Sequence, residues 1–290
     1  MLATSSDTES PKPATASATT AAAQRARGTV NLSVGAGSDK SEIARLYQSG
    51  CAKARIPRSA GSALEAILIN SSGGMTGGDK ISWGVGVEEN AYASITSQAC
   101  ERVYKAPADT AQVDIELTVA ENAKLAWLPQ ETILFDQGHL SRTLTAELDE
   151  KAEALFVESV IFGRGAMGEK VTQGSLHDRW RIRQGGKLIH AEDLRLAGDV
   201  AAISDQPFTL GGCGAMATVL LVSPSAEGHL SEVRKILTNA SGKQKSGASV
   251  WNGKLLARVM AKDGYELRKS LVPLINLLNF EAQVPKVWAI

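Results

Sequence analysis

The chain has 290 residues, and its 31 basic residues balance its 31 acidic ones. General nucleic-acid binding needs a basic excess, so we expect no nucleic-acid partner. The three cysteines, Cys51, Cys100 and Cys213, are widely spaced and form no CxxC pair, which is typical of reduced thiols in a cytoplasmic protein. No apolar run approaches the length of a transmembrane helix, so we expect no membrane contact either.

The N-terminal segment differs in composition from the rest of the chain. Residues 1–28 are mostly Ala, Ser and Thr with scattered charge, and they resemble neither a secretory nor a mitochondrial leader. Because such a segment has almost nothing to bury, we expect residues 1–40 to form a disordered tail. No linker interrupts the remainder, so residues 41–290 are expected to fold as a single domain.

Short alternating apolar runs follow one another from Ile81 to Leu196, the period-2 pattern of half-buried strands. A unit of charged turn, Ala, apolar strand and Gln or Glu recurs four times, at intervals of roughly thirty residues. It starts at Val87, Val119, Leu148 and, more loosely, Ile182. Recurrence at one period indicates strand–turn–strand units stacked on their neighbours. The sequence therefore predicts a mainly all-β fold, an elongated, solenoid-like stack of strands.

About two α-helices are expected near the C-terminus. Apolar residues recur at helical spacing in two segments, Leu230, Val233, Ile236 and Leu237, and then Leu267, Leu271, Leu274, Ile275 and Leu278. Pro273 lies within the second stripe and should kink that helix or mark its first turn. Amphipathic helices usually turn their apolar stripe inward, so we expect these helices to cover the core.

A glycine-rich stretch, residues 72–79, interrupts the strands early in the chain. Its four glycines could let backbone N–H groups approach a phosphate. However, no Lys-Ser or Lys-Thr pair follows, and the next segment looks like a strand, so the features of a P-loop are missing. We therefore interpret the stretch as a wide turn, with Asp79 exposed at its rim. The glycines concerned are Gly73, Gly74, Gly77 and Gly78.

Carboxylates recur near the expected strand ends, at Glu131, Asp136, Glu158 and Glu169. Two of them could form a glycosidase-type pair, but an acidic residue at a strand end is more often a solvated rim residue. Arg164 could form an ion pair with Glu169. The four histidines lie at no metal-binding spacing, and no G-x-S-x-G motif is present. The residues alone therefore predict no catalytic centre and no dedicated metal site.

Several blocks, taken in order, resemble the urease accessory protein UreD family, called UreH in some bacteria. They are Tyr47-Gln48-Ser49-Gly50 with Lys53, Arg55 and Pro57, INSSGGMTGGD from Ile69, TSQACERVYK from Thr96, WLPQETILFD from Trp127, ESVIFGRGAMGE from Glu158 and VPKVW from Val284. The resemblance covers the chain from about residue 41 to its end.

This resemblance implies a maturation factor without catalytic turnover. Members of the family bind apo-urease and, with UreF and the GTPase UreG, load two nickel ions at a carbamylated lysine. UreE is the metallochaperone that delivers the nickel, and it is only an indirect partner of the family. The family's fold is a largely β, coil-like stack of strands with two helices. No tightly bound cofactor is implied, although nickel could pass through in transit.

A carboxylate-lined route would hold nickel more weakly than a cage of His and Cys, and could therefore pass it on. The candidates for such a route are Asp79, Glu131, Asp136, Glu158 and Glu169. Gln98, Tyr104 and Arg164 are expected to brace its walls or a partner interface. The alternative is a β-solenoid enzyme that processes polysaccharide with paired carboxylates, but the chain has only 5 Trp, 4 Tyr and 5 Phe to stack against sugars.

Overall fold

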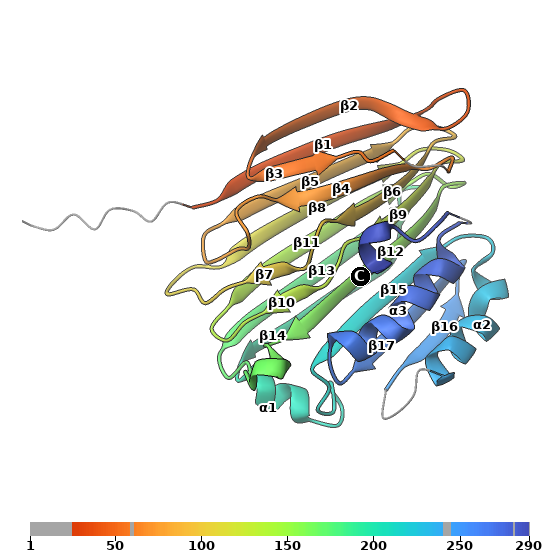
Figure 1. Cartoon of the computed structure of the whole chain (residues 1–290). Helices are drawn as coiled ribbons and strands as arrows, with labels where there is room; N and C mark the ends of the chain where they lie inside the picture. The colour runs from red at the N-terminus through yellow and green to blue at the C-terminus, as the bar shows by residue number, and fades with distance from the viewer. Residues whose placement is uncertain (1–24, 59–60, 240–244, 281, 290) are drawn as a thin grey trace, which may run out of the picture.

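The computed structural model describes residues 25–58, 61–239, 245–280 and 282–289. These residues build two facing β-sheets (Figure 1). Sheet A has seven strands, in the spatial order β14 (Lys187–Gly198), β13 (Gly174–Gln184), β11 (His139–Leu148), β8 (Ala111–Val119), β5 (Lys80–Val87), β1 (Arg27–Ala36) and β2 (Ser41–Gly50).

Sheet B has ten strands, eight of which form a continuous path. In spatial order these are β16 (Gly247–Trp251), β17 (Lys254–Ala261), β15 (Ala215–Val222), β12 (Glu153–Phe162), β9 (Lys124–Leu128), β6 (Tyr92–Ser97), β4 (Leu64–Asn70) and β3 (Ala52–Arg55). The short strands β7 (Glu101–Val103) and β10 (Thr132–Leu134) pair with each other beside β12.

The centre of the molecule is a stack of coils, as the repeat predicts. The chain passes from sheet A to sheet B between β5 and β6, β8 and β9, and β11 and β12. Consecutive coils pair in parallel within each sheet, so that Lys80 lies beside Gln112 and Tyr92 beside Lys124. Because each coil covers the apolar edge of the one before it, the prediction of stacked strands is confirmed.

Three of the four repeat copies form corners between the sheets. Asn90 and Asn122 take left-handed backbone conformations there, with φ of 60° and 55°, which Asn tolerates better than most residues. The fourth copy is different, since it forms the hairpin between β13 and β14 within sheet A. Gly185 and Gly186 both have positive φ, which allows a tight reversal. A polar turn of this kind suits either a coil corner or a hairpin, and this copy forms the hairpin.

The apolar core has two layers. One lies between the two sheets and includes Trp83, Ile95, Trp127 and Phe156. The other lies between the outer face of sheet B and the helices α2 (Ala226–Asn239) and α3 (Gly264–Leu278). Figure 1 shows α3 lying across β15 and β17. Strands β12 and β15 are covered on both faces, so they are almost continuously apolar where an edge strand would alternate.

The two helices expected from their apolar stripes are α2 and α3, and both turn these stripes toward the core. Pro273 lies in the interior of α3, so it does not mark the first turn. Two further short helices, α1 (Val200–Asp205) and the 3-10 turn η1 (Gly165–Met167), have no periodic signal long enough to predict. A second 3-10 turn, η2 (Lys286–Ala289), ends the described chain. None of the helices in the described residues is long and apolar enough to cross a membrane.

The expected boundary of the N-terminal tail at residue 40 was wrong. Strand β1 already begins at Arg27, lying parallel to β5 and antiparallel to β2. Its alternating residues Val30, Leu32 and Val34 are buried in the inter-sheet core, which stabilises the strand despite the polar composition around it. Residues 1–24, which make up most of the expected tail, lie outside the described residues.

Candidate functional site

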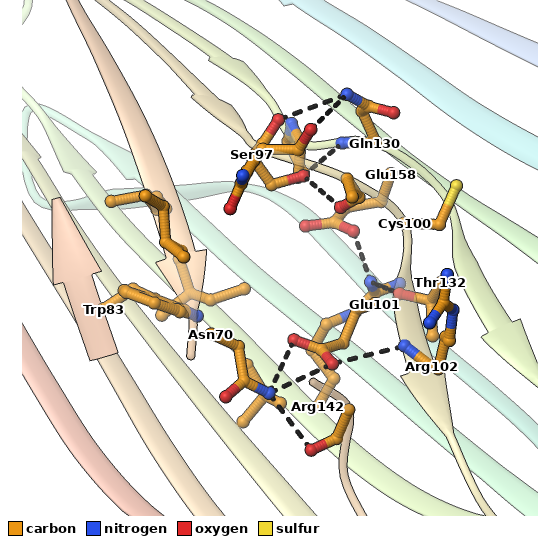
Figure 2. A pocket seen from close by; sticks show the side chains of 18 of the residues that line it. Asn70, Trp83, Ser97, Cys100, Glu101, Arg102, Gln130, Thr132, Arg142 and Glu158 are labelled. Atoms are coloured by element: carbon orange, nitrogen blue, oxygen red, sulfur yellow. Dashed lines mark hydrogen bonds and ion pairs between the residues drawn. The ribbon is translucent and has the colours of Figure 1, made fainter. Parts of the chain in front are cut away.

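A cavity of about 290 Å³ lies between the two sheets, at the level of β7 and β10 (Figure 2). Its apolar walls come from the inter-sheet core, through Trp83, Val113, Ile115 and Leu140. Polar groups enter from both sheets and the neighbouring turns: Asn70, Gln98, Cys100, Glu101, Arg102, Gln130, Thr132, Arg142 and Glu158. An apolar cavity with a few converging polar groups is the usual form of a binding site.

Arg142 occupies one wall of this cavity. It lies on β11 between Leu140 and Leu144, in the register that points toward the core. Its guanidinium donates to Asp178 on β13 (Nε to Oδ1, 3.1 Å) and to Thr132 Oγ1 (3.2 Å), and it forms a close ion pair with Glu158. Two carboxylates therefore share one guanidinium in an almost fully buried position.

Glu158 faces Arg142 from β12 and also accepts a hydrogen bond from Trp127 Nε1 at 2.8 Å. Burial raises the pKa of this carboxyl to about 7, against the opposing attraction of Arg142. The nearby Asp178 carboxylate raises the pKa further, because it repels the charged form of Glu158. Two properties of Glu158 suit weak cation binding. It lies on the cavity wall, and the one positive charge that faces it, the Arg142 guanidinium, is shared with Asp178.

Glu101 is the second carboxylate on the cavity wall. Asn70 Nδ2 donates to both of its oxygens, at 3.1 and 3.2 Å. Burial raises its pKa to about 7, and the hydrogen bond from Asn70 only partly offsets this effect. A carboxyl with this pKa changes its charge near neutral pH. Among the described residues Glu101 forms no close ion pair, although the charge of Arg102 also lowers its pKa and opposes the effect of burial.

Glu131 lies next to the cavity-lining residues Gln130 and Thr132 in the sequence, but its carboxylate contacts helix α3 and not the cavity. Its carboxylate receives two bonds from Arg268 of α3, at 2.7 Å from Nε and 2.8 Å from Nη2. Burial alone would raise the pKa of Glu131, but the hydrogen bonds and charge of Arg268 bring it below the ordinary value. Cys100 donates to the same carboxylate at 3.3 Å. Glu131 therefore ties α3 to sheet B and is not among the cavity-lining residues.

The other three candidate carboxylates also act within the fold. Asp79, expected to be exposed, is only 4% exposed, because it accepts from the backbone N–H groups of Ala26 (2.7 Å) and Thr76 (2.8 Å). Asp136 accepts from the backbone N–H of Thr172 at 2.7 Å. Glu169 forms the expected ion pair with Arg164, with 2.9 Å between Arg164 Nε and Glu169 Oε2. None of these three carboxylates lines the cavity.

The glycine-rich stretch forms a turn, as we interpreted it, and it also supplies cavity wall through Gly73 and Gly74. A side chain at Gly74 would come within 2.4 Å of the Tyr104 ring. A side chain at Gly77 would come within 2.0 Å of the Ala108 carbonyl oxygen, and Gly78 has a φ of 85°. The glycines are needed because the backbone packs closely here.

Of the three expected bracing residues, Gln98 lines the cavity. Tyr104 donates to the Gly73 carbonyl oxygen at 3.3 Å and packs edge-on against Phe135. The Arg164 guanidinium lies 4.8 Å from the centre of the same Phe135 ring. Tyr104 and Arg164 thus form an aromatic cluster beside the cavity turn and do not line the cavity itself.

Sequence reasoning missed Arg142, Asp178 and Glu101. The first two carried a usable signal, because each occupies an inward register position in an alternating strand. In β11 the inward residues are Leu140, Arg142, Leu144 and Ala146, and in β13 they are Leu176, Asp178, Trp180 and Ile182. A charged residue in such a row must find a partner in the core. Glu101 had no such signal, since β7 is only three residues long.

No group of three or more His, Cys, Asp and Glu side chains in the described residues is placed to hold a metal ion. The cavity offers the two carboxylates Glu101 and Glu158 with amide and hydroxyl oxygens around them, and the Cys100 thiol, whose pKa burial raises to about 11 so that it stays protonated. Such an oxygen-rich set binds divalent cations weakly compared with imidazole and thiolate.

Comparison with known proteins places these observations in a family. The model of the UreD urease accessory protein family matches residues 26–289. The urease accessory protein UreD of Mesorhizobium japonicum is 52% identical over 272 residues, covering 92% of this chain and 95% of that protein. UreD of Agrobacterium fabrum is 49% identical over 265 residues, covering 91% and 92%. UreD of Rhizobium leguminosarum is 47% identical over 265 residues, covering 91% and 96%. The chain therefore belongs to the UreD family of urease accessory proteins.

Proposed function

We propose that this urease accessory protein binds apo-urease together with UreF and UreG and helps deliver nickel to the urease active site, performing no catalysis of its own. UreE would supply the nickel without touching this chain. The observation that supports the proposal best is the inter-sheet cavity, which places Glu101 and Glu158 on its wall without a cage of strong ligands.

The chemistry of the cavity suits a cation that must be released again. Nickel binds imidazole and thiolate tightly, and copper binds such ligands more tightly still, so a His and Cys cage would trap metal. Carboxylate, amide and hydroxyl oxygens hold nickel weakly. Arg142 further limits the affinity, because a cation at Glu158 must compete with the guanidinium for the same oxygens.

The proposed route differs from the one that the sequence suggested. Glu158 remains in it, and Glu101 is added. The carboxylate oxygens of Asp79, Glu131, Asp136 and Glu169 are engaged by backbone N–H groups or by arginine, so we assign these residues to the walls and turns around the route.

A double substitution, Glu101→Gln with Glu158→Gln, tests the route. The chain would be co-expressed with urease and the other accessory proteins, and the nickel content of the purified urease measured by mass spectrometry. We expect nickel loading to fall about tenfold or more. Glu116→Gln serves as the control, because Glu116 lies on the exposed face of sheet A. Full nickel loading by the double variant would exclude the route.

Co-purification with UreF, UreG and apo-urease tests the partner set separately. If the double variant still assembles but loads no nickel, the defect lies in transit and not in docking. If it no longer assembles, the two carboxylates support the fold or an interface instead.

The alternative of a polysaccharide-processing enzyme gains no support. Its paired carboxylates would need open access, but Glu158 is buried against Arg142 and Trp127. The exposed aromatic residues Tyr47, Tyr104, Phe208, Trp251 and Tyr265 lie on separate elements and form no platform for sugars. We also propose a cytoplasmic site of action, since Cys51, Cys100 and Cys213 are all free thiols.

A further inference from the structure

The coil stack is open at the end formed by β2 and β3. Sheet A ends at β2 and sheet B at β3, and no other described strand pairs with the outer edge of either. Two single hydrogen bonds are made there, from the Ser41 N–H to the Ser62 carbonyl oxygen and from the Ala54 N–H to the Gln48 side chain. Figure 1 shows β2 as the outermost strand at this end. Apolar side chains remain accessible there, with Ile43 43% and Tyr47 54% exposed, and Leu46 and Ile56 only partly buried. Stacked-strand proteins normally cover such an end.

This open end is also the site of an uncompensated positive charge. Residues 41–58 contain Arg45, Lys53, Arg55 and Arg58 but a single acidic residue, Glu42. None of the four cations forms an ion pair with any described residue, whereas Arg142, Arg164, Arg181 and Arg183 each do. The segment is therefore basic, although the whole chain is neutral.

We propose that the outer edge of β2 takes up an extended, acidic segment of another protein as an additional strand of sheet A. From Arg45 to Gly50 the strand pairs with β1 without irregularity, so its other edge presents a regular row of N–H and C=O groups. Main-chain hydrogen bonds would supply the affinity. Ile43 and Leu46 pair with the buried Val34 and Leu32 of β1 and so lie on the core-facing side of β2, where they would contact alternate apolar residues of the added segment. Arg45 lies on the opposite face and would select for acidic residues.

Two other segments could in principle pair with this edge, namely β2 of a second copy of the chain and the chain's own residues 1–24, and charge disfavours both. A second copy of the chain would bring two basic ends together, which opposes association. The chain's own residues 1–24 contain Asp7 and Glu9 against Lys12 and are otherwise mostly Ala, Ser and Thr. That composition offers no strongly acidic segment to complement the basic edge.

A synthetic peptide of alternating Val and Glu, labelled with a fluorophore, is a suitable probe. We expect fluorescence anisotropy to show saturable binding to the full chain. Replacing a central Val by Pro removes a main-chain donor and should weaken binding about tenfold or more, and replacing every Glu by Lys should abolish it.

Charge reversal on the protein provides the matched comparison. The double variant Arg45→Glu with Arg55→Glu should bind the Val–Glu peptide about tenfold more weakly. Arg179→Glu, at an exposed arginine of β13 far from this end, should bind it like the wild type. Hydrogen exchange should also slow at residues 41–50 of the wild-type chain when the peptide is present.

Three results would overturn the proposal. They are equal binding of the proline-containing peptide, equal weakening by Arg179→Glu, and tighter binding of double-stranded DNA than of the peptide. The last result would identify the basic end as a general polyanion site and not a strand acceptor.

Discussion

Arg142 projects from β11 into the space between the two sheets, where its guanidinium contacts Glu158 and Asp178. A buried ion of this kind contributes little by itself, because its desolvation offsets the attraction of its partners. Removing the Arg142 guanidinium should nevertheless destabilise the fold strongly, because Glu158 and Asp178 would then remain in the core without a counter-charge.

The substitution Arg142→Met should therefore lower the free energy of unfolding by about 3 to 5 kcal/mol at neutral pH. The loss should be smaller near pH 5, because the stranded carboxylates can then take up protons. Urea unfolding at both pH values measures this. Arg179→Met is the control, since Arg179 is exposed and its replacement should change stability by less than about 0.5 kcal/mol. Equal effects of the two variants would contradict the assigned role.

Glu101 gives the protein a distinct pH dependence. Its pKa in the folded chain is raised to about 7 from an ordinary value of 4.5. The folded state then holds a proton that the unfolded state has lost, so this group makes stability fall as pH rises from about 4.5 to about 7. Glu101→Gln should remove up to about 3 kcal/mol of this fall. Unfolding curves between about pH 5 and pH 8 test it, and an unchanged slope would contradict the burial of a protonated Glu101.

At the scale of elements, the C-terminal segment ties the helical layer to sheet B. Trp288 in η2 is 2% exposed and donates from Nε1 to the Leu128 carbonyl oxygen at 3.0 Å. Gln130 donates to the Val287 carbonyl oxygen at 3.2 Å. The Arg268 guanidinium lies 5.4 Å from the centre of the Trp288 ring. The chain end therefore covers the outer face of β9, next to the network around Glu131.

Trp288→Ala should accordingly destabilise the fold by about 3 to 5 kcal/mol, because it leaves a large buried cavity. Trp251→Ala is the matched control, since Trp251 is 40% exposed at the edge of sheet B, and its loss should be about 1 kcal/mol or less. Thermal or urea unfolding distinguishes the two variants. A mild effect at Trp288 would mean that the segment rests on the sheet without stabilising it.

At the scale of the whole molecule, the two sheets and the helical layer protect the strands unequally. Strands β5, β8 and β11 have neighbours on both sides. Strand β2 has one neighbour and is largely exposed. Backbone amides in the central coils should therefore exchange with solvent only through global unfolding, while those of β2 open locally.

Hydrogen exchange read by mass spectrometry tests this difference on the chain alone. Peptides covering residues 111–119 should exchange far more slowly than peptides covering residues 41–50. Equal protection of the two segments would show that the open end is covered in solution.

Sequence patterns accounted for much of this architecture. The period-2 runs located most strands, the repeat predicted that coils stack, and two apolar stripes located α2 and α3. These succeeded because alternation and helical spacing are local consequences of burying one face. The pattern left open whether a copy forms a coil corner or a hairpin, and the loosest copy forms the hairpin between β13 and β14. Two glycines decided the direction of the chain there.

The sequence by itself determined the strand-rich fold and, through its specific blocks, the family. Only the tertiary structure decided which carboxylates share a cavity. Asp79 and Glu158 both look like acidic residues at the edge of a strand, yet backbone N–H groups engage the first, while the second faces Arg142 across the core. The physical reason is that burial and charge pairing depend on distances between residues far apart in sequence, and neither composition nor spacing contains those distances.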